Sequence, residues 1–353
     1  MQIKERQFLA VFTTFAIGGP ARWFAEAASE AEIAEANEWA RQQGVPLFVL
    51  GGGSNVLVAD EGFAGLVLHV GLKGIERDGE RFRVGAGESW DEFVERAVGL
   101  ECAGVECLAG IPGTVGGTPV QNVGAYGQEV ASVIESVRAF DLNACEFVEF
   151  SNAECGFAYR RSRFNSNDRG RYIVTRVDYR LQQNGAPQIT YQDLKAHFAG
   201  RPTAPTLAET AGTVRSIRRS KGMLLVDGDP DCRSAGSFFK NPTVTEEVAD
   251  RVRKFAESAG VPVKVFPAED GLVKIPAAWL IEQAGFRKGH LLGAAGISSR
   301  HTLALVNLGG ATAKEILALA DKIRASVEEK FGIRLEMEPE MVGFEGQGIG
   351  NRE

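Results

Sequence analysis

One short stretch, Ala235–Pro242, combines residue types that can carry out chemistry. Its sequence is Ala-Gly-Ser-Phe-Phe-Lys-Asn-Pro, so Ser237 stands between a glycine that allows close backbone approach and two phenylalanines that can exclude water. No G-x-S-x-G elbow frames Ser237. The setting therefore favours proton donation from a sheltered hydroxyl over nucleophilic attack. A turn with two core phenylalanines and an exposed Lys240 is the alternative interpretation of the same residues.

Two glycine-rich loops follow apolar segments in the first half of the chain. The first is Leu50–Asn55, and the second runs from Ala109 to Thr118 and continues into Gln121–Gly127. Such loops present backbone N–H groups to phosphate oxygens. Neither fits G-x-G-x-x-G with a downstream acid, and neither ends in G-K-[ST]. Two loops suit a ligand with two adjacent phosphates, such as FAD; tight turns are the alternative.

Several basic residues can face an anionic substrate. Arg160, Arg218 and Arg219 suit a carboxylate through two-pronged donation, and Lys221 suits a phosphate as a point charge. Tyr191 can cover a pocket. Taken singly, the basic residues are equally explained as surface charges and Tyr191 as a half-buried core tyrosine.

Composition excludes several classes of protein. The 353 residues carry a net charge of −7 and no basic run, which argues against a nucleic-acid partner. Five cysteines without C-x-x-C spacing and four scattered histidines predict neither a disulfide framework nor a metal site. The apolar run Phe8–Val11 is too short for a secretory signal, and no stretch approaches the ~20 residues of a membrane span. We expect a cytoplasmic protein without a membrane partner.

Strands, glycine turns and helices alternate, which predicts a mixed α and β class. Capping patterns at Ser29, Ser89 and Thr312 predict helix starts. Leu335–Met341 alternates apolar residues with Glu336, Glu338 and Glu340, which predicts a strand whose three carboxylates share a solvated face. Residues from 345 onward are expected to form a loose tail. Further elements are expected as strands at 12–15, 46–50, 56–58, 66–70, 81–84, 133–140, 173–181 and 303–308, and as helices at 207–220, 248–259 and 276–281.

Six motifs in fixed order, spread over residues 14–344, resemble one family. The chain closely resembles the UDP-N-acetylenolpyruvoylglucosamine reductases of peptidoglycan synthesis, and Tyr191–Leu194 resembles the substrate-covering tyrosine loop of their longer subtype. The motifs are Leu50–Asn55, Ile111–Gly117, Gln121–Gly127, Tyr159–Arg160, Gly236–Pro242 and Pro339–Glu340.

The resemblance implies an α+β protein with an FAD-binding fold of the vanillyl-alcohol-oxidase (PCMH) type. That fold would be built in two parts, residues 1–70 joined by the C-terminal strand 334–353, and residues 71–222. A C-terminal α+β substrate-binding domain would span residues 235–333.

The resemblance also implies the reaction and the residues. NADPH reduces FAD, hydride passes from flavin N5 to C3 of the enolpyruvyl ether of the UDP-sugar, and C2 is protonated. By motif position, Arg160 and Glu340 stabilise the substrate carboxylate and Ser237 donates the proton. The implied cofactor-binding residues are Leu50, Gly51, Gly52, Gly53, Ser54, Asn55, Gly113, Gly116, Gly117, Thr118, Gln121, Asn122, Gly124 and Ala125. The implied substrate-binding residues are Tyr159, Tyr191, Arg218, Lys221, Asn241 and Gln283.

Two departures and two alternatives bear on this interpretation. Thr13 stands where the family usually has Asn, and the loop between Lys221 and Ser237 is longer than in many relatives, which affects the expected place of Lys221. A flavin oxidase on the same fold and a non-catalytic nucleotide-sugar-binding protein are the alternatives. We expect a monomer.

Overall fold

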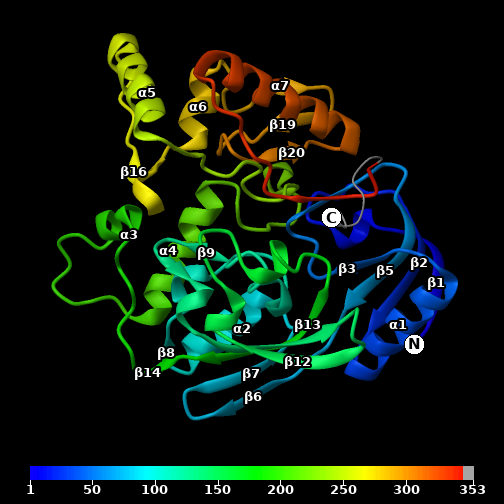
Figure 1. Cartoon of the computed structure of the whole chain (residues 1–353). Helices are drawn as coiled ribbons and strands as arrows, with labels where there is room; N and C mark the ends of the chain where they lie inside the picture. The colour runs from blue at the N-terminus through cyan, green and yellow to red at the C-terminus, as the bar shows by residue number, and fades with distance from the viewer. Residues whose placement is uncertain (345–353) are drawn as a thin grey trace.

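A mostly parallel sheet and an antiparallel sheet form the larger part of the computed structural model, which describes residues 1–344 (Figure 1). The first sheet has the order β1-β2-β5-β3, with β2, β5 and β3 parallel and β1 antiparallel at the edge. Its strands are β1 (Ile3–Phe8), β2 (Pro20–Ala27), β3 (Leu47–Leu50) and β5 (Phe63–Val70). Helix α1 (Glu30–Gln43) packs on this sheet; the Ser29 hydroxyl accepts from the N–H of Glu32 at its start, as predicted.

The second sheet is five-stranded and antiparallel, in the order β12-β11-β13-β7-β6. Its strands are β6 (Ile75–Asp78), β7 (Arg81–Gly85), β11 (Ile134–Asp141), β12 (Glu146–Ser151) and β13 (Tyr172–Arg180). Helix α2 (Trp90–Gly99) packs on it through Phe93, whose ring lies 5.1 Å from that of Tyr179. Helix α4 (Leu207–Ser220) packs on α2. Both helices begin as predicted, because Ser89 and Thr206 accept from the N–H groups of the first turn.

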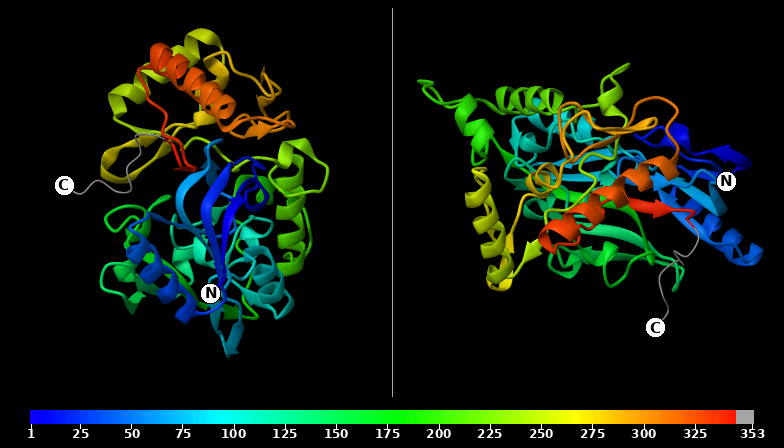
Figure 2. Two further views of the ribbon diagram at one scale, coloured as in Figure 1. Left: turned by 90° about the vertical axis from the view of Figure 1, so that its right-hand side faces the viewer. Right: turned by 90° about the horizontal axis from the view of Figure 1, so that it is seen from above.

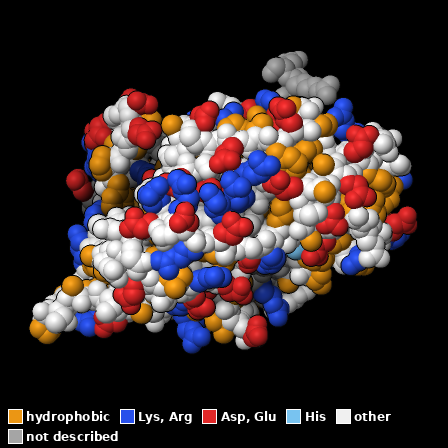
Figure 3. All heavy atoms as spheres, turned by 90° about the horizontal axis from the view of Figure 1, so that it is seen from below, with side chains coloured by type: hydrophobic (Ala, Val, Ile, Leu, Met, Phe, Trp, Pro, Cys, Tyr) orange, Lys and Arg blue, Asp and Glu red, His pale blue; other side chains and the backbone are white. Residues whose placement is uncertain are grey.

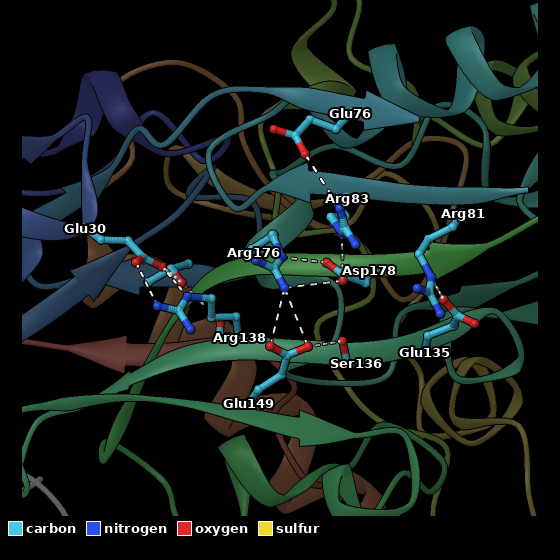
Figure 4. Close-up of polar contacts among 11 residues, drawn as sticks. Glu30, Glu76, Arg81, Arg83, Glu135, Ser136, Arg138, Glu149, Arg176 and Asp178 are labelled. Carbon is cyan, nitrogen blue, oxygen red and sulfur yellow. Dashed lines mark hydrogen bonds and ion pairs between the residues drawn. The ribbon is translucent and has the colours of Figure 1, made fainter. Parts of the chain in front are cut away.

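The other face of the five-stranded sheet carries interleaved charges rather than a binding site. Arg176 pairs with Asp178 and Glu149 (2.6 and 3.4 Å), and Arg81 pairs with Glu135 (Figure 4). The view from below shows basic and acidic side chains interspersed on that side of the molecule (Figure 3). Strands exposed on one face alternate in this way, and exposed ion pairs contribute little to stability.

The C-terminal part forms a separate layer of helices and small sheets, seen above the rest of the chain in Figure 1 and in the left view of Figure 2. A hydrophobic core joins its elements, and the long helix α7 begins with a reciprocal capping box between Thr312 and Glu315. The helices are α5 (Glu246–Ala259), α6 (Ala277–Gln283) and α7 (Ala313–Phe331). The strands are β15 (Thr243–Val244), β16 (Phe266–Pro267), β17 (Val273–Lys274), β18 (Leu291–Leu292), β19 (Ala295–Ile297) and β20 (Leu305–Asn307).

The N-terminal segment crosses between these parts, which the sequence did not predict. The expected strand at 12–15 is absent: Ala10–Phe12 is a 3-10 turn, and Phe15 is fully buried in the core of the C-terminal part together with Ile17 and Leu57. The chain turns sharply here, because Ala16 has a φ of +53°. The conformation of this segment is therefore set by the burial of Phe15 in a core formed mainly by residues far away in the sequence, and not by the local strand pattern.

The chain also returns at its C-terminal end. Strand β21 (Glu340–Val342) pairs in parallel with β4 (Val56–Val58), and Val342 packs with buried residues of the first sheet. The predicted strand from Leu335 is therefore wrong in length, because β21 begins only at Glu340. The expected tail at 345–353 lies outside the described residues. Within residues 1–344, no helix has the length and apolar character needed to cross a membrane.

Candidate active site

The two glycine-rich loops lie against each other. A Cβ atom on Gly52 would stand 2.6 Å from Cα of Gly113, and one on Gly53 would stand 1.8 Å from the carbonyl oxygen of Phe12. Any side chain at these positions would collide with backbone, so glycine is required at both. The loops follow β3 and α2 respectively, and the N–H of Trp90 at the start of α2 donates to the carbonyl of Gly113 (3.1 Å). The backbone groups of the two glycine-rich loops therefore lie side by side.

An unsatisfied hydroxyl lies at this junction. Thr114 Oγ1 is buried without a hydrogen-bond partner among the described residues, and a Cβ on Gly51 would lie 3.0 Å from it. Leaving a buried hydroxyl unpaired costs free energy, so such a group is typical of a site that a ligand completes. A hydroxyl and two glycine loops suit the phosphates of a dinucleotide, so the residues present fit FAD.

Some side chains predicted to bind the cofactor are used elsewhere. The hydroxyl of Thr118 is buried and lies 2.7 Å from that of Tyr179, and Leu50 is fully buried. The Asn122 amide is also buried and donates to the carbonyl of Ala158 (3.1 Å). These three side chains hold the loops in place, which leaves only their backbone groups for a ligand.

Ser237 directly precedes a residue whose backbone hydrogen-bonds to a segment near the end of the chain. The N–H of Glu338 donates to the carbonyl of Phe238 (2.9 Å), and Phe239 bridges to Met337. Both phenylalanines are buried, as expected both for an apolar setting of the serine and for a turn with two core phenylalanines. Ser237 itself is partly exposed. The segment that contains Ser237 is thus paired with the segment that carries Glu338.

Arg160 meets the Glu338 carboxyl group from a third part of the chain. Its Nε lies 3.3 Å from Oε1 of Glu338, and its Nη2 donates to the carbonyl of Gly124 (2.8 Å). Arg160 has a φ of +54°, an unfavourable conformation for a residue other than glycine. The Asn165 amide stabilises it by donating to the Arg160 carbonyl (3.1 Å). Backbone strain of this kind is concentrated at functional sites.

Burial dominates the electrostatics of Glu338. It raises the pKa of this carboxyl group above its ordinary value, while the nearby Arg160 acts in the opposite direction. The Glu338 side chain is only 13% exposed. A carboxyl group with a raised pKa keeps its proton up to a higher pH than an exposed one, and in its protonated form it can donate a hydrogen bond.

The Glu340 side chain makes a different contact from that of Glu338. The Glu340 side chain is 46% exposed and pairs with Arg169 (3.1 Å), and Glu336 pairs with Lys240 on the surface. The predicted common face of the three carboxylates is wrong because Glu338 and Pro339 precede β21, so strict alternation does not reach back to them. Glu338, and not Glu340, forms the ion pair with Arg160, while the catalytic role predicted for Glu340 stays a prediction.

The first glycine loop is tied to this cluster. The Asn55 amide donates to Gln121 Oε1 (2.9 Å) and to the carbonyl of Glu338 (3.3 Å), and the N–H of Glu340 donates to the Asn55 carbonyl (2.9 Å). The loop that fits the cofactor and the segment that carries the buried carboxyl group are therefore held in one arrangement.

A second polar cluster surrounds Lys221. Its Nζ donates to Oδ2 of Asp193 (2.8 Å) in helix α3 (Gln192–His197), and lies 5.6 Å from the ring centre of Tyr126. The Tyr126 ring in turn contacts that of Tyr191 edge to face at 5.3 Å. Burial opposes the charge of Lys221, but the Asp193 carboxylate outweighs it and raises the lysine pKa. Lys221 thus holds the tyrosine loop, with Tyr191 43% exposed at its surface.

His301 joins this cluster and was missed by the sequence analysis. The N–H of Leu303 donates to its Nδ1 (3.1 Å), which leaves the proton of the neutral ring on Nε2. Burial, then Lys221 and Lys288, lower the His301 pKa to about 4. A neutral imidazole beside two ammonium groups can donate to an anion. No spacing rule in the sequence links His301 to Lys221, so only the fold reveals it.

His301 should make the protein sensitive to acid. Its pKa is lower in the folded state than in the unfolded state, so unfolded chains bind the proton first and stability falls as the pH drops from 6.5 to 4. With a folded pKa of about 4, we expect a loss of about 3 kcal/mol over that range. Urea unfolding at pH 7 and pH 4.5 measures it. His301→Gln should flatten the dependence, and an unchanged pH dependence would contradict the assignment.

Arg218 and Gln283, two further residues predicted to bind substrate, contact other parts of the protein, and their role stays a prediction. Arg218 is buried and donates to the carbonyls of Gly110 (2.9 Å) and Met223 (2.7 Å), so it supports the second glycine loop from behind; burial lowers its pKa. Gln283 ends α6, and its carbonyl accepts from Lys330. Because α6 starts beside Asn241 and rises ~1.5 Å per residue, Gln283 lies about 9 Å farther along its axis.

The remaining predicted residues border the two clusters. Asn241 Oδ1 accepts from the N–H of Ala277 (2.9 Å) and so caps α6, which leaves its amide nitrogen for another partner. Tyr159 is 45% exposed and its ring is covered by Lys274. No group of His, Cys, Asp and Glu among the described residues is arranged to hold a metal ion.

Comparison with known proteins identifies the family of the chain. A model described as UDP-N-acetylenolpyruvoylglucosamine reductase, C-terminal domain, matches residues 229–342, and an FAD binding domain matches residues 21–150. The UDP-N-acetylenolpyruvoylglucosamine reductases of Streptomyces coelicolor and Thermobifida fusca are 46% and 47% identical over 95% of this chain, covering 89% and 96% of theirs. The crystal structure of the Thermus caldophilus enzyme covers 97% of this chain and 99% of its own, with 29% identity and a TM-score of 0.68. The chain therefore belongs to the UDP-N-acetylenolpyruvoylglucosamine reductase family.

Proposed function

We propose that the protein reduces the enolpyruvyl ether of UDP-N-acetylglucosamine to UDP-N-acetylmuramate, with FAD as cofactor and NADPH as reductant. This makes it an enzyme of peptidoglycan precursor synthesis. One observation carries the proposal: Arg160, Ser237 and Glu338 come from three distant segments, and Asn55 ties the Glu338 segment to the glycine loop that fits the cofactor.

The cofactor would be held by the two glycine loops. Bound FAD would supply hydride chemistry, taking a hydride from NADPH and delivering it to C3 of the substrate. Thr114 would add a hydroxyl donor to the backbone groups of both loops. The residues proposed to line this site by backbone or side chain are Leu50, Gly51, Gly52, Gly53, Ser54, Asn55, Gly113, Thr114, Gly116, Gly117, Thr118, Gln121, Asn122, Gly124 and Ala125.

The protein's own residues would control charge and protons around the enolpyruvyl group. Hydride addition at C3 pushes negative charge toward C2 and the carboxylate. Arg160 would bind that carboxylate as a fixed cation. Glu338, which contacts Arg160, or Glu340, by motif position, would donate a hydrogen bond to it. Ser237 would then transfer its hydroxyl proton to C2. Phe238 and Phe239 exclude water from this side, which a weak acid such as serine requires.

The nucleotide part of the substrate would meet the cluster around Lys221. We propose Lys221 and His301 as donors to its phosphates, with Tyr159, Tyr191 and Asn241 at the border. We also propose a division into residues 1–70 with the C-terminal strand, residues 71–222 and residues 235–333. A separate hydrophobic core supports the last of these, although Phe15 and Leu57 pack in it, whereas the first two share one core. A monomer in the cytoplasm is proposed, and five unpaired cysteines suit that location.

Flavin absorbance tests the proposal directly. The purified protein should be yellow, should bleach with NADPH under anaerobic conditions, and should recover its colour when the enolpyruvyl sugar nucleotide is added. Recovery with oxygen alone at a comparable rate would indicate an oxidase on this fold. A colourless protein that does not take up FAD would leave only nucleotide-sugar binding.

A further inference from the structure

Lys274 lies at the site without a role in the reaction as described so far. It ends strand β17. This strand pairs with β15, which follows directly after Asn241 and Pro242 in the sequence. Its Nζ lies 3.7 Å from the ring centre of Tyr159, and the Arg160 guanidinium carbon lies 5.5 Å from the same ring centre. One tyrosine ring therefore contacts two cations that are 114 residues apart in the sequence.

Arg160 and Lys274 differ in whether an acidic side chain pairs with them. Arg160 has the Glu338 carboxyl group at 3.3 Å, whereas Lys274 has no ion pair within 4 Å among the described residues and contacts only the face of a ring. Lys274 is partly buried. Burial, and then Arg160, lower the lysine pKa, with Glu129 and Glu269 acting in the opposite direction. Glu338 is the one carboxyl group paired with either cation among the described residues, so the two cations leave unbalanced positive charge at this position.

An anion that balances this charge must also reach Arg160. The substrate carboxylate is the anionic group that the proposed function already places there, and it has two oxygens, so it can accept from a guanidinium and an ammonium at once. The substrate phosphates are the other anionic part, but the Lys221 ammonium group and the neutral His301 supply a separate cluster of donors for them.

We propose that Lys274 is a further catalytic residue that binds the enolpyruvyl carboxylate together with Arg160. The inference rests on the proposed function. Because negative charge on the carboxylate grows as hydride adds to C3, the ammonium group stabilises the transition state more than the bound substrate. Stacking on Tyr159 holds the flexible lysine side chain in place before the substrate arrives.

Two ligands that differ only in the carboxylate-bearing group test this assignment. UDP-N-acetylmuramate carries a lactyl carboxylate, whereas UDP-N-acetylglucosamine carries the same nucleotide sugar without it. Titration of the oxidised flavoprotein, followed by calorimetry, should show that Lys274→Met weakens binding of UDP-N-acetylmuramate about 10- to 100-fold. Binding of UDP-N-acetylglucosamine should change less than about threefold. The matched control is Lys221→Met, which should weaken both ligands to a similar extent.

Turnover provides a second readout. In rapid-mixing experiments, Lys274→Met should slow reoxidation of reduced enzyme by saturating substrate, whereas Lys274→Arg should restore most of the rate because it keeps the charge. Equal loss of affinity for both ligands would assign Lys274 to the nucleotide and overturn the proposal. Unchanged affinity for both would do so as well. If the wild-type protein bound both ligands but did not reduce the enolpyruvyl substrate, the proposed function would fail independently of Lys274.

Discussion

Replacing Ser237 with alanine should slow the oxidative half-reaction by about 10²- to 10⁴-fold, the range expected for loss of a positioned proton donor. The alanine keeps the backbone pairing between the Phe238 carbonyl and Glu338, so the surrounding structure should persist. Without the hydroxyl, C2 of the substrate has no donor on a side from which Phe238 and Phe239 exclude water. Rapid-mixing absorbance at the flavin band measures this rate separately.

The reductive half-reaction is the internal control for this variant. Reduction by NADPH requires no proton from Ser237, so its rate should stay within a few-fold of the wild type. Ser237→Cys should retain more activity than Ser237→Ala, since a thiol can still donate a proton. Equal slowing of both half-reactions would rule out the proton-donor role.

Glu338 and Glu340 should differ sharply when each is changed to glutamine. Glu338→Gln is expected to lower kcat by about 10²- to 10³-fold, as for removal of a preorganised transition-state stabiliser. Glu338 is buried against Arg160, whereas Glu340 is half-exposed and pairs with Arg169. Glu340→Gln removes only a surface ion pair, so its kcat should stay within about twofold of the wild type.

Steady-state kinetics of the two variants decides which carboxyl group acts. Both substitutions conserve volume and both positions lie within three residues, so they are matched controls for each other. Thermal unfolding checks that each variant is folded. A large loss in Glu340→Gln with a normal Glu338→Gln would show that the Pro339–Glu340 motif had indicated the right residue.

Local patterns in the sequence predicted the elements that depend on local physics. The capping residues Ser29, Ser89 and Thr312 begin helices where expected, because a cap and its helix are separated by only a few residues. The glycine loops were predicted for the same reason, since close backbone approach tolerates no side chain there.

The arrangement of the site could not be predicted in the same way. Alternation placed Glu336, Glu338 and Glu340 on one face, yet only Glu338 is buried, since its environment is set by Arg160 from 178 residues earlier. His301 and Lys274 carry no motif at all. Their roles depend on a neighbour's charge or ring, contributed by Lys221 and Tyr159. Contacts of this range are fixed by the tertiary fold.

The burial of Phe15 among residues 235–335 has a consequence for biosynthesis. The ribosome releases this phenylalanine at least 220 residues before the first of those partners, a delay of roughly 10 to 60 seconds at 5–20 residues per second. During that interval the first sheet can form, but Phe15, which lies between β1 and β2, lacks its C-terminal packing partners. The nascent chain therefore exposes an apolar segment around Phe15 until its last third is synthesised. We expect chaperones to bind this segment, and removing the segment should prevent the C-terminal core from forming completely.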